Sequence, residues 1–116
     1  MTGAGLGMLK YLWLDETGFR EEFRSDPPTF TELQQKVGDE RDSYVEYARY
    51  YFPDPTITFA CDEDGHPKGL DLVGWIGDYP LVGAIFFFAQ SHPNSEQIMG
   101  LTDNQISIIK EYATAK

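Results

Sequence analysis

LVGAIFFFA, residues 81–89, is the most apolar stretch of the sequence and the one on which the fold depends. Apolar residues occupy both alternating sets of positions, which is typical of a strand covered above and below, with partners on both sides. The stretch is about half as long as a bilayer requires. Because proteins avoid long apolar edge strands, we expect this strand to be central. Either residues 8–14 or a second copy of the chain would then pair with it.

The segment before this strand predicts a β-hairpin. Apolar and smaller or polar residues alternate over residues 56–61, which indicates a half-buried strand with Cys61 on its apolar side. A charged turn, residues 62–67, separates it from a second strand over residues 69–76. Residues 77–80 (GDYP) then turn the chain again.

Two further segments precede this region. Residues 8–14 (MLKYLWL) fit either a short buried strand or a helical turn, because their apolar residues satisfy both periodicities. Residues 15–24 are compatible with a short helix that places Phe19 and Phe23 on one side and ends at residues 26–28 (DPP).

Helices are predicted more strongly at three other places. Thr29 and Glu32 have the spacing of a capping box, which predicts a helix to about residue 37. A second helix is expected over residues 40–51. Thr102 with Gln105 repeats the capping pattern and predicts a C-terminal helix from residue 103 to about 113. The tyrosine-rich stripe of the second helix keeps the spacing of one buried face, through Tyr44, Tyr47, Ala48 and Tyr51.

This order of elements predicts an α+β domain. We expect a small antiparallel sheet of three to four strands, packed against about three to four helices and ending in a C-terminal helix. The length suits one domain over residues 1–116, with the glycine-rich residues 1–7 frayed.

Charge excludes several classes of function. Nine Lys and Arg against 19 Asp and Glu give a net charge of −10, so neither phosphate-neutralising nucleic-acid binding nor attraction to an anionic membrane surface is expected. Cys61 is the single cysteine, so no intrachain disulfide can form. Residues 1–7 carry no signal-peptide pattern, and we expect a cytoplasmic protein.

No complete catalytic or metal set is recognisable. The acidic turn fails the EF-hand pattern, because Ala60 falls at the position of the first ligand. Cys61 and His66 formally offer a thiol and an imidazole, but a buried thiol beside carboxylates has its thiolate disfavoured. We therefore assign no catalytic residue, metal or cofactor, and do not expect an enzyme.

The leading hypothesis is a small acidic protein-binding module, of the inhibitor or toxin-immunity type, that occupies a basic partner. Its contacts are expected in the region whose charge is least compensated, residues 55–95, and among tyrosines that one helix stripe cannot bury. These candidate residues are Asp62, Glu63, Asp64, Asp71, Asp78, Tyr47 and Tyr50.

Two alternatives remain open. The first is a small enzyme or ligand-binding domain with an aromatic pocket between sheet and helices, lined by Trp13, Trp75, Phe86 and Phe88, with polar groups from His66, Asp71 and Asp78. The second is a structural homodimer that joins through a sheet edge.

Overall fold

The computed structural model describes residues 8–37, 44–92, 95 and 97–116. Over these residues the chain is mostly β, with eight strands in two antiparallel sheets and three short helices, so the predicted α+β arrangement with one small sheet is wrong. In chain order the elements are β1 (Leu9–Asp15), β2 (Gly18–Arg24), α1 (Phe30–Val37), β3 (Val45–Arg49), β4 (Ile57–Asp62), α2 (Gly65–Lys68), β5 (Leu72–Ile76), β6 (Tyr79–Val82), β7 (Ile85–Ala89), α3 (Asp103–Tyr112) and β8 (Ala113–Ala115).

The larger sheet has the order β2-β1-β7-β4-β3, which places β7 at its centre as the sequence predicts. Phe87 of β7 is opposite Leu12 of β1 on one side and Phe59 of β4 on the other. All five residues of β7 are buried. Of the two partners considered for this strand, the segment that becomes β1 is the one that pairs with it, so the sheet is completed within the chain.

The apolar stretch 81–89 is not one strand but two. Gly83 has a φ of +72°, a conformation that glycine adopts without strain, and it separates β6 from β7. β6 then belongs to the second, three-stranded sheet, whose order is β6-β5-β8. Gly83 therefore lies where the chain passes from the three-stranded sheet to the five-stranded sheet.

The predicted hairpin between residues 56–61 and 69–76 does not form. Both strands exist, as β4 and β5, but β4 pairs with β3 and β7, whereas β5 pairs with β6 and β8. The one-turn helix α2 lies between them. Apart from half-buried Cys61, the residues of β4 are buried on both faces, because β4 is an interior strand of the larger sheet.

Two predicted helices are replaced by strands. Residues 15–24 form the turn of the β1–β2 hairpin and β2 itself, with Phe19 opposite Leu14 and Phe23 opposite Lys10. The predicted helix over residues 40–51 includes β3, and its residues 40–43 lie outside the described residues. The side-chain pattern of both segments also fits the two-residue period of a strand. Pairing of β2 with β1 and of β3 with β4 determines which structure forms.

The other two helices are confirmed. In α1 the Thr29 hydroxyl accepts the Glu32 amide N–H at 3.1 Å. In α3 the capping box is complete, because Thr102 and Gln105 bond each other's backbone N–H groups at 3.1 and 2.8 Å. Within the described residues, no helix is long and apolar enough to cross a membrane.

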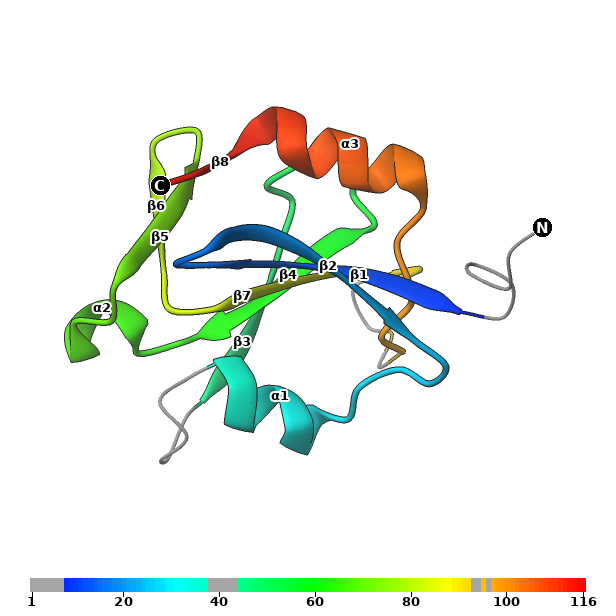
Figure 1. Ribbon diagram of the computed structural model, residues 1–116, viewed down its shortest axis with the longest axis horizontal. Coiled ribbons are helices and arrows are strands. Elements are labelled where there is room, and N and C mark those ends of the chain that lie inside the picture. The colour runs from blue at the N-terminus through cyan, green and yellow to red at the C-terminus, as the bar shows by residue number, and fades with distance from the viewer. Residues whose placement is uncertain (1–7, 38–43, 93–94, 96) are drawn as a thin grey trace.

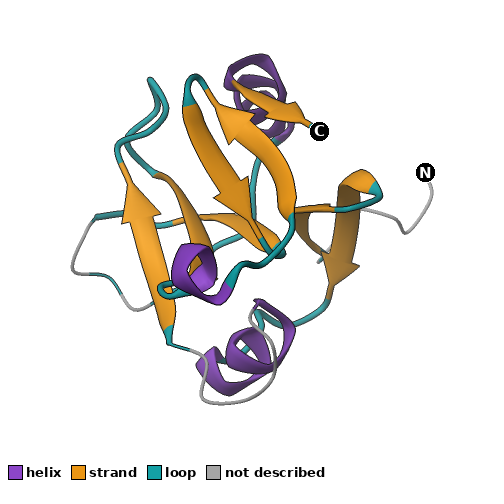
Figure 2. Cartoon of the chain, turned by 90° about the vertical axis from the view of Figure 1, so that its left-hand side faces the viewer, coloured by secondary structure: helices purple, strands orange, loops and turns teal. Residues whose placement is uncertain are grey.

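The core lies on both faces of the larger sheet. Figure 1 shows α1 and α3 on opposite sides of it, and Figure 2 shows β8 beside α3. Alternate residues of β7 separate the two cores, since Phe87 packs toward β5, β6 and α3 while Phe86 and Phe88 pack toward α1. The first core also contains Leu12, Leu14, Ile57, Phe59, Val73, Leu81, Ile106 and Ile109, and the second contains Tyr11, Trp13, Leu33, Val37 and Ile98.

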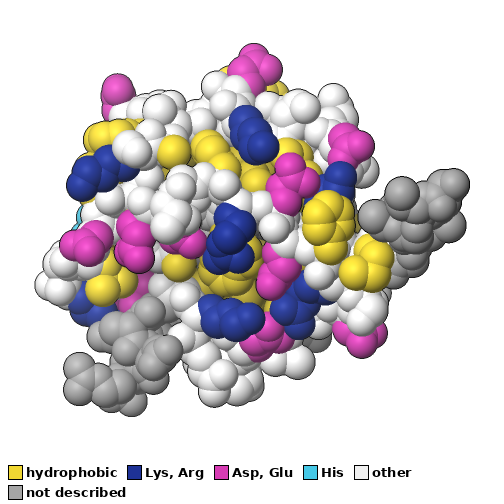
Figure 3. Space-filling view, in the orientation of Figure 1, with side chains coloured by type: hydrophobic (Ala, Val, Ile, Leu, Met, Phe, Trp, Pro, Cys, Tyr) yellow, Lys and Arg dark blue, Asp and Glu magenta, His cyan; other side chains and the backbone are white. Residues whose placement is uncertain are grey.

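Charges of both signs are interspersed on the face shown in Figure 3. Several acidic groups pair with neighbouring cations, as in the two-pronged pair in which the Arg24 guanidinium donates to Glu32 at 2.7 and 2.9 Å. Arg20 pairs with Asp15 at 3.3 Å, and Lys36 pairs with Glu32 at 3.0 Å.

Candidate functional site

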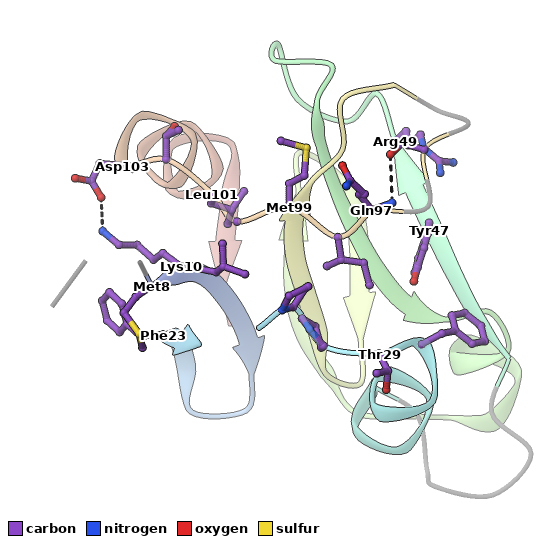
Figure 4. A pocket seen from close by; sticks show the side chains of 18 residues that line it. Met8, Lys10, Phe23, Thr29, Tyr47, Arg49, Gln97, Met99, Leu101 and Asp103 are labelled. Atoms are coloured by element: carbon purple, nitrogen blue, oxygen red, sulfur yellow. Dashed lines mark hydrogen bonds and ion pairs between the residues drawn. The ribbon is translucent and has the colours of Figure 1, made fainter. Parts of the chain in front are cut away.

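A groove of about 1230 Å³ crosses one end of the larger sheet (Figure 4). It is lined by the start of β1, the end of β2, the residues that lead into α1, the outer part of β3, and the segment before α3. In Figure 4, Met8, Lys10 and Phe23 lie at one end, Tyr47 and Arg49 at the other, and Met99 and Leu101 between them. Its walls thus come from three regions of the sequence, residues 8–30, 47–49 and 95–103.

The groove exists because β1 and β7 separate toward this end and another segment enters between them. Met99 exchanges two backbone hydrogen bonds with Ala89, both at 2.9 Å, and the Leu101 N–H donates to the Lys10 carbonyl at 2.7 Å. The buried Tyr11 hydroxyl donates to the Ile98 carbonyl at 2.8 Å. Burial raises the pKa of Tyr11 to about 12, so this hydroxyl keeps its proton at physiological pH. The groove floor is therefore held by backbone and buried side-chain bonds.

The groove exposes an unusual set of apolar side chains. Met8, Phe23, Phe30 and Met99 are 37%, 48%, 48% and 42% exposed. Phe30 also contacts the ring of Tyr47 at 6.2 Å, which joins the start of α1 to β3 across the groove. Large apolar residues gathered in one concave surface are typical of a binding site, whereas single exposed ones are ordinary.

Two cations border this apolar surface and differ in their partners. The Lys10 ammonium pairs with the Asp103 carboxylate and lies 5.5 Å from the centre of the Phe23 ring, so its charge is neutralised locally. The Arg49 Nε donates to the side-chain oxygen of Gln90 at 3.0 Å. Among the described residues, the bond to Gln90 is the one hydrogen bond that the structure shows for the Arg49 guanidinium, and no carboxylate lies within ion-pair distance of it.

Gln90 fixes Arg49 from inside the protein. Gln90 is 2% exposed, its Nε2 donates to the Ser95 carbonyl at 2.7 Å, and its oxygen also accepts the Thr58 hydroxyl at 3.3 Å. A buried amide with these partners cannot turn without losing hydrogen bonds. The orientation of the Arg49 guanidinium is thereby set before any ligand arrives.

The predicted partner-binding residues do not form one site. Asp62, expected at an exposed tip, is buried, and its carboxylate accepts from Lys68 at 2.8 Å. Asp71 and Asp78 are exposed but lie before and after β5, at its opposite ends. Tyr47 faces the groove, and Tyr50 is 67% exposed with a φ of +69°. Glu63 is exposed and Asp64 half-buried next to α2.

Acidic and aromatic residues also lie together on the other face of β3. Tyr51 and Tyr79 contact each other with ring centres 5.2 Å apart, and His66 lies 6.3 Å from Tyr79. Glu46 and Glu63 lie close to the same place, since both raise the pKa of the nearby Cys61. We call Glu46, Glu63, Tyr51 and Tyr79 the acidic surface; Glu46 and Tyr51 were missed by the sequence analysis because residues 40–51 were expected to be helical.

Cys61 packs against the first core, on the apolar side of its strand as predicted, but it is half-buried rather than buried. Burial raises its thiol pKa to about 12, and the charges of Glu46, Asp62 and Glu63 act in the same direction. A thiol held in its protonated form at neutral pH is a poor nucleophile.

The predicted aromatic pocket is filled by the core. Phe86 and Phe88 are fully buried under α1, and Trp13 is 4% exposed beside Phe86. Trp75 is in the other sheet. The groove is instead lined by residues from turns and strand ends. The sequence has no local pattern that predicts their convergence; it shows only Phe and Met residues among prolines and polar residues.

Within the described residues, no three His, Cys, Asp or Glu side chains lie close enough to hold a metal ion. No protein-family model, curated protein or solved structure matches the chain.

Proposed function

We propose that this protein is a binding module that takes an apolar ligand in its groove. The observation that carries the proposal is the alignment of Met8, Phe23, Phe30 and Met99 along one concave surface, each between one third and one half exposed. Covering the exposed half of a large apolar side chain contributes about 1 kcal/mol, so the four together supply about 4 kcal/mol toward binding. The bonded floor of the groove reduces the conformational cost of binding.

Titration with the neutral fluorescent probe N-phenyl-1-naphthylamine tests this proposal. The probe gains fluorescence in an apolar site, and we expect saturable binding to the wild-type protein. Phe30→Asp should weaken binding by about tenfold, because it places a carboxylate on the groove wall while an acidic first residue suits a helix. Tyr112→Asp is the matched control, since Tyr112 is 43% exposed but does not line the groove. Absent binding, or equal binding by both variants, contradicts the proposal.

A second candidate is a basic protein partner at the acidic surface. Glu46 and Glu63 line the same small pocket as Tyr79, which contacts Tyr51, so this surface provides negative charge and rigid contact area together. We propose a cytoplasmic location for the protein, in keeping with its free cysteine.

Affinity capture at low and high salt tests this second candidate. A basic protein retained by the wild type at 50 mM salt should be lost at 500 mM salt, and also with the double variant Glu46→Lys, Glu63→Lys. Retention that depends neither on salt nor on these two carboxylates removes the candidate.

A further inference from the structure

We propose that the groove selects a long-chain carboxylic acid, with the carboxylate on Arg49 and the alkyl chain along the apolar lining. This inference rests on the proposed function and specifies the chemistry of its ligand.

The polar end of the groove is built for an anion. The two Nη groups of Arg49 are available for a two-pronged contact with a carboxylate, which is the geometry that a guanidinium prefers. Gln90 holds the guanidinium through Nε alone, so binding costs little reorientation. The Tyr47 side chain lies two residues away on the same face of β3 and lines the same groove.

The rest of the groove is suited to an alkyl chain. Figure 4 shows Met99 and Leu101 between the Arg49 end and the Phe23 and Met8 end. Lys10 lies at the far end, but its charge is neutralised by Asp103, so the ligand needs no second anionic group at that end. Within the described part of the groove, a cation without a carboxylate partner lies at one end and apolar side chains line the remainder, which matches a molecule with a single anionic head.

The acidity of the protein does not oppose this assignment at close range. Glu46 neighbours Tyr47 in β3 but points to the opposite face of the sheet, where it lies near Cys61. The carboxylates of the acidic surface are thus separated from Arg49 by the sheet itself.

Displacement of N-phenyl-1-naphthylamine by decanoate and by 1-decanol tests the inference. The two molecules share the same chain and differ only in the head group. We expect decanoate to bind the wild-type protein at least tenfold more tightly than decanol at pH 7.5. Arg49→Gln should remove this preference while leaving decanol binding within twofold, and Arg49→Lys should restore part of it. Equal affinities for the two molecules in the wild type overturn the inference and leave the proposed function standing.

Two further outcomes are decisive. If neither molecule displaces the probe, and the probe itself does not bind, both the inference and the proposed function fail. If sedimentation shows a wild-type dimer that Phe30→Asp converts to a monomer, a second copy covers the groove and the inference is overturned. The comparison of the two molecules on the wild type needs no variant, so the test holds even if Arg49→Gln fails to fold.

Discussion

Replacing Gln90 by leucine removes the buried amide that orients Arg49, and the expected loss in the free energy of unfolding is the sum of the three hydrogen bonds that this amide makes. The bond from Arg49 at 3.0 Å involves a charged group and contributes about 1.5 kcal/mol or more, and the bond to Ser95 at 2.7 Å about 1 kcal/mol. The bond from Thr58 is longer, at 3.3 Å, and contributes about 0.5 kcal/mol. Leucine fills a similar volume, so the sum of about 3 kcal/mol is the expected loss.

The free energy of unfolding from a urea titration measures this loss. Gln97→Leu is the matched control, because Gln97 is exposed in the same loop, and it should change the free energy by less than about 0.5 kcal/mol. A Gln90→Leu loss below about 1 kcal/mol would show that the three bonds do not hold Arg49, and the argument for a prearranged anion site would fall with it. The same variant should also lose most of the preference for decanoate over decanol.

Three other predictions test the fold and its titrating groups. In Gly74→Ala the added Cβ would overlap the Thr114 carbonyl oxygen, so β8 must shift. We expect the free energy of unfolding to fall by about 1–3 kcal/mol and amide exchange in β8 to become faster; an unchanged exchange rate would contradict the close packing of β5 against β8. The Cys61 thiol, with its pKa raised to about 12 from 9.0, should react with iodoacetamide at pH 8 about a thousandfold more slowly than an exposed cysteine, and at the ordinary rate in urea. The pKa of Glu32 is lowered chiefly by its bonds from Arg24, so this pair stabilises the protein above pH 4.5 and the stabilisation is lost as the pH falls. Glu32→Gln should therefore lose less stability than the wild type between pH 6 and pH 3. Urea titrations at the two pH values measure this difference.

The strand at the centre and the capped helices were predictable because their signals are local. In β7 every position is apolar, which is typical of a strand covered on both faces, and Thr102 with Gln105 forms a complete capping box at the start of α3. β3 was not predictable in the same way. The segment around β3 fits period 3.6 through Tyr44, Tyr47 and Tyr51, and β3 itself fits period 2 through the alternation of Glu46 and Tyr47. The choice between helix and strand depends on pairing with β4.

The groove was beyond sequence reasoning for a different reason. Phe23, Phe30, Tyr47 and Met99 come from four segments, and each taken singly is an ordinary exposed apolar residue. Their convergence follows from the entry of the segment before α3 between β1 and β7, which no short-range pattern announces. The acidic turn illustrates the converse, since Asp62 belongs to a charged run yet is buried against Lys68.

The place of β7 between two hairpins also determines the order in which the larger sheet can be assembled. β1 with β2 and β3 with β4 are each joined over short stretches of chain, whereas the pairing of Leu12 with Phe87 closes a loop of most of the molecule. Closing that loop costs entropy before the apolar contacts of β7 compensate for it. We therefore expect the two hairpins to form before β7 docks between them.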